Sequence, residues 1–391
     1  MNSSMRLRTA VFWGSAGSVA YAYFGFPLLL GVRAVAAPRP VRRAPITPTV
    51  SLIIAAHNEA AVIADKLTNV AAVAYPPDSL EVIVASDGSD DATVAIASTH
   101  PTKPIVLDLP RRGKNPTLND AVACATGEVL VFSDADTKVG VDSLRALVAP
   151  FADSEVGGVA GDFQYVADGA QGEGERTYWS IDRFTKQLQT RAGSVTSATG
   201  QLHAVRRTLW SPVPSGVADD SFTSVGVAEA HHRLVFEPAA TATGPVEQDV
   251  REEARRKARY IARGLRSVWE HRRALNPLTH GWYAIQLASH KIVRRLVAIP
   301  IVLLAIVSPF LWRRGRMYRA ATAAQVGVHG LAALGWFAHR RGRRKGAVLR
   351  VAAMATYFDL VNVAVLRAMA ELARGNRRDV WTPQRSTPGA P

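Results

Sequence analysis

The sequence of 391 residues contains a single cysteine, Cys124. An intramolecular disulfide and a metal cluster built on cysteines are therefore excluded. The composition is also unlike that of a disordered protein, because 48% of the residues are hydrophobic and only 20% are charged. We find no internal repeats. A chain of this length can form a folded core of about 200 residues or more, since single domains commonly span about 50–250 residues.

Acidic residues are scarce in the C-terminal part of the chain. Residues 285–391 contain 18 lysines and arginines but only three aspartates and glutamates, so they carry the whole formal net charge of +15. These basic residues alternate with apolar stretches. That pattern favours a tail seated at a membrane over a nucleic-acid-binding domain, so we expect no nucleic-acid partner.

Charged residues are absent from residues 9–32, an apolar run of more than 20 residues. About 20 apolar residues suffice for a helix to cross the hydrocarbon layer, so we predict an uncleaved transmembrane anchor over residues 1–36. A signal peptide is the alternative, although the run is long for one and contains Pro27. Four arginines follow the run and two precede it, which predicts a cytoplasmic position for the next domain.

After a proline-rich linker over residues 37–48, short apolar stretches alternate with helical patterns. Strands are predicted over residues 50–56, 80–85, 104–107 and 128–132. Helices are predicted over residues 59–72, 91–98 and 115–125. This alternation predicts an α/β domain over residues 49–280 with a mostly parallel sheet. Residues 142–270 are less regular, apart from a charged helix predicted over 246–271.

Residues 281–385 are predicted to form amphipathic and transmembrane helices, followed by a tail over 386–391. Three apolar segments, 296–312, 320–338 and 347–370, suggest about three C-terminal spans. The basic joins between these segments conflict with three crossings, because one join would then lie outside the cell. A segment that lies in the membrane interface is the alternative.

Unusual polar residues stand at the ends of the predicted strands, where α/β sheets bind their ligands. The sequences are His57-Asn58-Glu59, Asp87-Gly88-Ser89 and Asp134-Ala135-Asp136. Two carboxylates in the last of them suit a hard divalent cation, Mg²⁺ or Mn²⁺, with a diphosphate completing its coordination shell. A loop or helix-capping pair is the alternative.

Other polar residues have both a functional and a structural interpretation. Asp87 could accept hydrogen bonds from a base or ribose, and Lys114 could neutralise a phosphate. One carboxylate of Asp219-Asp220 could serve as a general base. The basic residues around Tyr260 could form a cationic, aromatic lid. Taken singly, these features also fit turns, solvated loops and a charged surface helix.

Taken in order, these motifs resemble the membrane-bound family 2 glycosyltransferases with the GT-A fold, which include cellulose, chitin, hyaluronan and poly-N-acetylglucosamine synthases. The resemblance extends from Val50 to Arg385. It implies Asp220 as the catalytic base, and Asp134 and Asp136 as metal ligands. The residues it implies for nucleotide-sugar binding are Ala56, Glu59, Asp87, Lys114, Asp134 and Arg259. Those it implies for the acceptor or the lid are Gly200, Gln201, Asp219, Arg256 and Tyr260.

The resemblance implies an inverting enzyme of the inner membrane that moves a hexose or N-acetylhexosamine from a nucleotide sugar, expected to be UDP-linked. The acceptor would be a glycan or a lipid, and the enzyme would contact membrane lipids. An accessory membrane subunit is compatible with this resemblance. The lid departs from the family, because Arg256 and Tyr260 stand where Gln and Trp are usual, so processive synthesis stays open. A non-catalytic scaffold that binds nucleotide sugars is the alternative.

Overall fold

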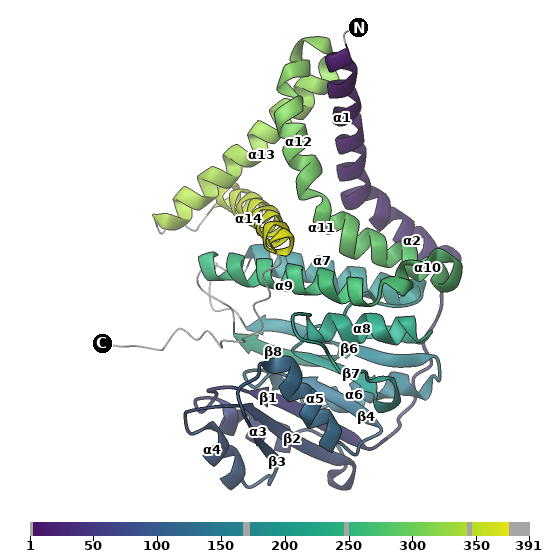
Figure 1. The fold of residues 1–391 in the computed structure, drawn as a ribbon, viewed down its shortest axis with the longest axis vertical. Coiled ribbons are helices and arrows are strands. Elements are labelled where there is room, and N and C mark those ends of the chain that lie inside the picture. Colours follow the sequence, from purple (N-terminus) through teal and green to yellow (C-terminus); the bar gives the residue numbers. More distant parts are fainter. Residues whose placement is uncertain (1–2, 167–172, 246–249, 342–345, 375–391) are drawn as a thin grey trace.

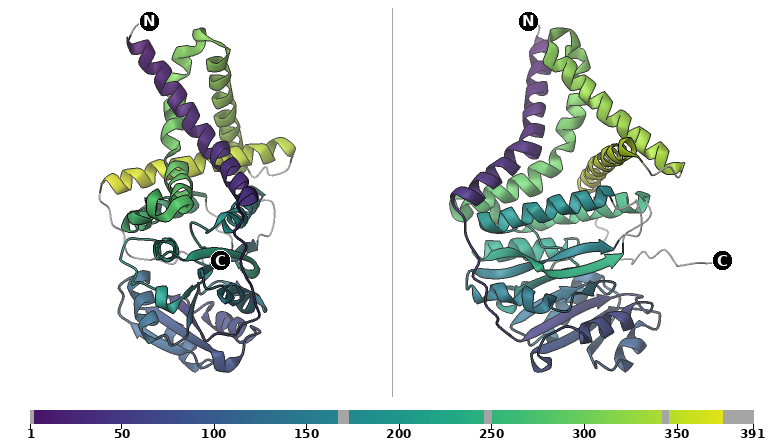
Figure 2. Two further views of the ribbon diagram at one scale, coloured as in Figure 1. Left: turned by 90° about the vertical axis from the view of Figure 1, so that its right-hand side faces the viewer. Right: turned by 180° about the vertical axis from the view of Figure 1, so that it is seen from behind.

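The computed structural model describes residues 3–166, 173–245, 250–341 and 346–374 of the protein (Figure 1). An α/β domain occupies one end of the molecule, and helices from both ends of the chain lie together at the other (Figures 1 and 2). The strands are β1 (Val50–Ala56), β2 (Leu80–Asp87), β3 (Ile105–Leu109), β4 (Val129–Ser133), β5 (Lys138–Val139), β6 (Val156–Val166), β7 (Leu202–Arg206) and β8 (Arg233–Pro245).

All eight described strands form one sheet in the order β3-β2-β1-β4-β7-β6-β8-β5. The first four are parallel to one another, as the alternating pattern predicts. The other half corrects the prediction of a mostly parallel sheet, because β7 runs antiparallel to both β4 and β6, and β5 runs antiparallel to β8. The glycines and polar residues of β6 and the two irregularities in its pairing with β8 explain why this half gives no clear periodic signal.

The sheet is covered by helices on both faces, so the strand β1 is apolar except for Ser51. All seven residues of β1 are buried. Leu52 and Ile54 pack into one core cluster with Leu67, whereas Ile53 and Ala55 on the opposite face pack into a second cluster. A parallel strand that is buried on both faces reads as a continuous apolar run, which is why this strand is predicted with its correct bounds.

The helices of the α/β domain follow the predicted order, and three of them were not predicted. The residues 59–72, 91–98 and 115–125 correspond to α3 (Ile63–Ala71), α4 (Thr93–Thr99) and α5 (Lys114–Cys124), and the charged helix to α9 (Val250–Glu270). The others are α6 (Ser143–Val148), α7 (Glu173–Ala192) and α8 (Asp219–Glu229).

The remaining described helices come from the two ends of the chain. They are α1 (Ser3–Ala20), α2 (Phe26–Ala36), α10 (Pro277–Leu287), α11 (Arg294–Leu296), α12 (Ala298–Val307), α13 (Arg316–Arg340) and α14 (Ala347–Ala373), with π-helical segments η1 (Tyr21–Gly25) and η7 (Ala288–Val293). Two described stretches, Ser3–Ala36 and Val348–Ala370, are long and apolar enough to cross a membrane. The expected number of about three C-terminal spans is therefore not confirmed.

Helix α14 differs in orientation from the other helices of this layer. Figures 1 and 2 show α1, α12 and α13 extending away from the α/β domain, whereas α14 lies across its surface beside α9. Apolar residues of α14, Ala364 and Val365 among them, pack with Ala258 and Ile261 of α9. This arrangement favours the alternative in which one apolar segment lies in the membrane interface.

Candidate active site

Lys114 joins the two acidic pairs that the sequence singled out. It begins α5, and its Nζ lies 2.9 Å from Asp134 Oδ1 and 3.4 Å from Asp219 Oδ2. Burial opposes its charge, but the attraction of Asp134 and then of Asp219 holds the pKa of Lys114 above its ordinary value. Carboxylates separated by 85 positions in the chain therefore meet around one cation.

The Asp134–Asp136 segment follows β4 directly, at the carboxyl end of the strand. Ser133, the last residue of β4, donates a hydrogen bond to the carbonyl of Gln201 (3.1 Å). Gly200 and Gln201, which were predicted for the acceptor or the lid, form a turn that leads into β7, which pairs with β4, so this turn lies beside the aspartates. The roles of Gly200 and Gln201 toward the acceptor remain predictions.

The two aspartates fit a divalent cation by their charge and by their position after the carboxyl end of β4. Burial raises the pKa of Asp136, and the neighbouring negative charge of Asp134 raises it further. A carboxylate whose charge is disfavoured in this way is stabilised when a cation binds. No cluster of three or more His, Cys, Asp or Glu side chains suited to a metal occurs among the described residues. Oxygens of a bound diphosphate and water would thus complete the shell.

Asp219 and Asp220 begin α8, yet their environments differ. Burial disfavours the charge of Asp219, but Lys114 overcomes this and lowers its pKa. Burial, reinforced by the charge of Asp219, raises the pKa of Asp220 to about 6. Adjacent carboxylates whose pKa values are driven apart commonly divide the roles in an active site. Asp219 is suited to hold Lys114, and Asp220 to exchange a proton near neutral pH.

Tyr260 on α9 contacts the second of these carboxylates. Its hydroxyl donates a hydrogen bond to Asp220 Oδ2 (3.1 Å), and the backbone N–H of Ser221 donates to Asp220 Oδ1 (2.7 Å). The guanidinium of Arg295 lies 5.7 Å from the centre of the Tyr260 ring. The sequence placed Tyr260 in the lid, and it did not reveal this contact with Asp220.

Asp87 is completely buried at the end of β2 and orients the loop before α5. Its carboxylate accepts hydrogen bonds from the backbone N–H groups of Arg112 (2.7 Å) and Gly113 (2.9 Å). Gly113 has φ = 95°, a conformation that glycine adopts without steric cost, and Lys114 follows it directly. Asp87 thereby positions Lys114, while its predicted contact with a base remains a prediction.

The loop after β1 packs against the loop after β2. Ala56 and Glu59 are buried, and the backbone N–H of Glu59 donates to Thr93 Oγ1 (2.8 Å). His57 Nδ1 lies 2.9 Å from the carbonyl oxygen of Asp87. Asn58 has φ = 53°, and its side-chain oxygen accepts from the N–H of Asp90 (3.0 Å). These bonds hold the loop after β1 against the loop after β2.

Two predicted lid residues remain predictions. Arg259 is half-buried on α9, one position before Tyr260. Arg256 lies in the same helix, but its side chain is outside the described residues, as is the tail segment Trp381–Arg385.

Two buried basic residues beside the site escaped the sequence analysis. Lys66 on α3 donates to Ser133 Oγ (2.6 Å) and to the carbonyl of Thr137 (2.7 Å), and burial lowers its pKa to about 8. His203 on β7 stacks on Phe132, and burial lowers its pKa to about 4. The sequence pattern could have predicted the burial of Lys66, because this lysine falls on the apolar face of α3 between Ile63 and Val70.

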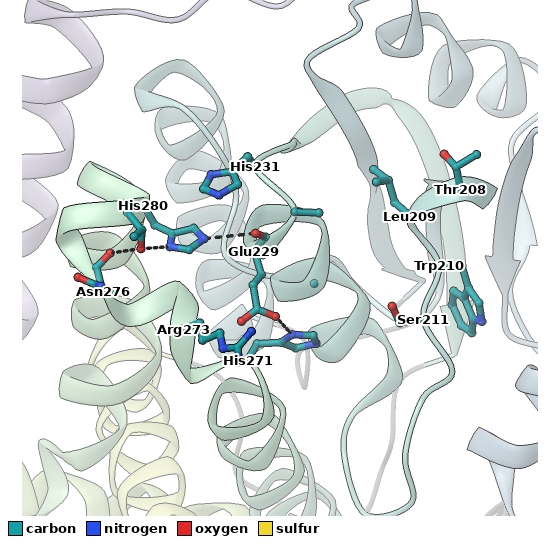
Figure 3. A pocket seen from close by; sticks show the side chains of 13 residues that line it. Thr208, Leu209, Trp210, Ser211, Glu229, His231, His271, Arg273, Asn276 and His280 are labelled. Carbon is teal, nitrogen blue, oxygen red and sulfur yellow. Dashed lines mark hydrogen bonds and ion pairs between the residues drawn. The ribbon is translucent and has the colours of Figure 1, made fainter.

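A cavity of about 670 Å³ lies at the other end of α8 from Asp220 (Figure 3). Glu229 accepts a short hydrogen bond from His271 (2.6 Å), and His231 stacks on His280 with ring centres 4.8 Å apart. These contacts join the end of α8 to α10 and to the turn after α9. The cavity is therefore separate from the acidic pairs at the beginning of that helix.

Comparisons with known proteins place this arrangement in a family. Residues 51–211 match the family described as "Glycosyl transferase family 2". This part of the chain is a family 2 glycosyltransferase domain. The resemblance seen in the sequence is thereby confirmed, and the matched segment contains β1–β4, the Asp134–Asp136 pair and the Gly200–Gln201 turn.

Curated relatives of the glycosyltransferase domain are named for different products. A beta-monoglucosyldiacylglycerol synthase of Trichormus variabilis is 31% identical over 169 residues, which cover 41% of this chain and 36% of the relative. A poly-beta-1,6-N-acetyl-D-glucosamine synthase of Staphylococcus epidermidis is 26% identical over 195 residues, covering 48% and 47%. The chain thus spans less than half of either relative.

A solved structure extends the likeness beyond the glycosyltransferase domain. It is a mannosyltransferase from Pyrobaculum calidifontis in complex with GDP-Man and Mn²⁺, with a TM-score of 0.70 and 23% identity. The similarity covers 92% of this chain and 98% of that one, so it includes most of the flanking helices. The likeness establishes the GT-A fold, with the mixed sheet described above.

Proposed function

We propose that this protein is a membrane-bound, inverting glycosyltransferase that moves a sugar from a nucleotide sugar to a glycan or lipid acceptor. The observation that supports this most strongly is the contact of Lys114 with both Asp134 and Asp219. It brings a pair of carboxylates suited to a metal diphosphate beside a pair that includes a suitable base. The first pair follows the carboxyl end of β4, where α/β folds bind ligands, and the second pair begins α8.

In the proposed reaction, Asp220 accepts the proton of the acceptor hydroxyl while that oxygen attacks the anomeric carbon of the sugar. The bond from this carbon to the diphosphate oxygen breaks in the same displacement, so the configuration inverts. A pKa of about 6 leaves Asp220 ionised at neutral pH, yet basic enough to accept a proton. Its hydrogen bond from Tyr260 orients the carboxylate.

The departing nucleoside diphosphate needs positive charge around its oxygens. Asp134 and Asp136 would hold a divalent cation, Mg²⁺ or Mn²⁺, which neutralises this charge when bound. Lys114 lies against Asp134 and supplies a second positive charge, and Arg259 is proposed to assist from α9. Ala56, Glu59 and Asp87 are proposed to shape the nucleoside pocket. Gly200 and Gln201, beside Ser133, are proposed to border the sugar and the acceptor.

The two apolar stretches and the packing of α14 on the α/β domain support the proposed position at a membrane. We propose an inner-membrane protein whose catalytic domain faces the cytoplasm. The named relatives make a glycolipid and a polysaccharide, so both acceptor classes are carried into the proposal. The nucleotide is proposed to be UDP, with GDP as the competing choice because the solved mannosyltransferase binds GDP-Man.

A screen of UDP- and GDP-sugars tests the proposal. The purified full-length protein in detergent is mixed with each sugar and Mn²⁺ or Mg²⁺, and release of the nucleoside diphosphate is measured with and without membrane extract as a source of acceptor. Release that depends on both the cation and Asp220 is expected. Binding of a nucleotide sugar without any release would instead support the non-catalytic scaffold. The length of radiolabelled products separates a polymerase from an enzyme that transfers one sugar.

A further inference from the structure

Four basic side chains gather around His290, where the C-terminal helices meet the α/β domain, and one of them, Lys291, acts on Asp220. We call them the basic cluster: Lys186 of α7, Lys291 of η7, and Arg294 and Arg295 of α11. All four act electrostatically on His290, and burial together with their charges keeps the pKa of His290 well below its ordinary value. The proposed function assigns no role to this cluster.

Lys291 is the member that points most clearly to a ligand. Its side chain is only 6% exposed, and the structure gives its ammonium no hydrogen bond or ion pair with any described residue. Burial, followed by repulsion from Arg295, lowers the pKa of Lys291 to about 7, although attraction to Asp220 acts in the opposite direction. A buried cation without a direct partner is costly, and an anion that binds beside it removes that cost.

The other members of the basic cluster contact both charged and neutral groups. Lys186 pairs with Asp182 of the same helix (2.9 Å). The guanidinium of Arg294 donates to His290 Nε2 (3.1 Å), and His290 Nδ1 lies 2.8 Å from Thr196 Oγ1, so this imidazole is neutral. Arg295 donates to the carbonyl of Ile261 (3.1 Å). The printed partner of Arg294 is thus a neutral imidazole, and this contact does not neutralise the charge of its guanidinium.

The basic cluster also lies beside the N-terminal membrane helix. The hydroxyl of Tyr21 in η1 contacts Ser289 Oγ (2.7 Å), and Phe26 of α2 stacks on His290. Lys291 itself belongs to a π-helical segment, a local distortion that often occurs at functional sites. The site is therefore placed between the catalytic base and the helices expected to enter the bilayer.

We propose that the basic cluster binds the phosphate of the acceptor, and that the acceptor is a phosphate-bearing lipid whose hydroxyl group reaches Asp220. This inference rests on the proposed function, since it names the acceptor class of the same site. A phosphate offers oxygen acceptors for charge-assisted hydrogen bonds from lysine and arginine, and a lipid anchor would account for the position next to η1 and α2.

Lipid binding in the absence of any nucleotide sugar tests the proposal. The full-length protein in detergent micelles is incubated with phosphatidylglycerol or with neutral diacylglycerol, and the retained lipid is measured by native mass spectrometry. The wild type is expected to retain phosphatidylglycerol preferentially. Lys291→Met should weaken this retention about tenfold or more, because bonds to charged groups are the stronger hydrogen bonds. Lys291→Arg should largely restore it, and Arg272→Met, which removes an exposed cation outside the cluster, should leave it unchanged.

Competition identifies the source of the phosphate. If glycerol 3-phosphate displaces phosphatidylglycerol at a similar concentration, the site recognises phosphate but its acceptor is water-soluble. Equal retention of both lipids by the wild type, or unchanged retention by a correctly folded Lys291→Met, would overturn the proposal. If Lys291→Met does not fold, the proposal is tested by the wild type alone, which must retain phosphatidylglycerol more strongly than diacylglycerol. Since no transfer is measured, failure here is distinct from failure of the proposed glycosyltransferase activity.

Discussion

At the scale of single residues, Asp219 and Asp220 show how neighbouring carboxylates acquire different chemistry. Both are aspartates at the start of one helix, but only Asp219 has a lysine within ion-pair distance among the described residues. The pKa of Asp219 is lowered, whereas the pKa of Asp220 is raised to about 6. The difference arises from the direction in which each side chain leaves the helix, which sequence spacing alone does not specify.

Asp220→Asn should abolish proton acceptance while it preserves the shape of the side chain. We expect kcat to fall by about 10²–10⁴-fold, the usual contribution of a general base. Affinity for the nucleoside diphosphate should change little, because the group acts on the acceptor. Nucleoside diphosphate release and calorimetry measure the two effects. Asp142→Asn, which alters an exposed aspartate outside the site, serves as the control. Near-normal turnover of Asp220→Asn would move the base elsewhere.

The pKa of Asp220 also predicts a pH dependence. The base is active when ionised, so kcat/KM should fall by about tenfold per unit as the pH drops below about 6. Tyr260→Phe removes a hydrogen bond to the ionised carboxylate, which raises the pKa of Asp220 and should shift this acid limb to higher pH. The pH profiles of the two proteins are compared. An acid limb at the same pH in both would contradict the role assigned to Tyr260.

At the scale of elements, the site depends on how the loop after β3 is held. Asp87 comes from the end of β2, yet its contacts are with Arg112 and Gly113, which precede α5. A residue with a predicted binding role thus also has a structural role. The same holds for Lys66, which links α3 to the end of β4 beneath the Asp134–Asp136 segment.

Asp87→Ala should leave the two N–H groups of this loop without their acceptor. We expect a loss of about 1–3 kcal/mol in the free energy of unfolding, since buried polar groups lose that much when their partner is removed. Nucleotide binding should weaken as well, because Lys114 follows the loop. Thermal melting and calorimetry test this. Asp108→Ala on β3, an exposed aspartate, should leave both nearly unchanged. Comparable melting temperatures for all three proteins would refute the structural role.

At the scale of the whole molecule, the position of α14 decides how the chain meets the membrane. By length and composition, Val348–Ala370 qualifies as a span. The helix nevertheless packs along α9, and Lys257 of α9 lies over the ring of Tyr357 on α14 (5.2 Å). The second half of the helix, from Tyr357 onward, packs on α9, which favours a position in the interface over a crossing of the bilayer.

Cysteine labelling tests this arrangement, because Cys124 is the one cysteine of the chain and is exposed. In a Cys124→Ser background, single cysteines replace Val348 or Arg374 at the two ends of α14. An impermeant thiol reagent should label both from the cytoplasmic side of membrane vesicles. Leu7→Cys in α1 should be labelled from the opposite side, if the anchor crosses. Labelling of the two α14 ends from opposite sides would show that this helix spans.

The sequence alone determined the parallel half of the sheet, the order of its helices and the family. The signals that allowed this are local in the sequence. They are continuous apolar strands, polar residues at the ends of these strands, and runs without charged residues. It also placed Asp134, Asp136 and Asp220 among the candidates for chemistry. The antiparallel strands were missed because β6 and β7 pair across distant segments and lack a clean apolar period.

Only the tertiary structure decided which of these residues meet. Lys114 contacts Asp134 and Asp219, and Tyr260 contacts Asp220, although these partners lie more than 15 positions apart in the sequence. The burial of Lys291 likewise depends on the packing of distant segments. The physical reason is that desolvation and charge–charge interactions depend on distance in space. A linear pattern records residue types, whereas the pKa of a carboxylate and the direction of a helix depend on what packs against them.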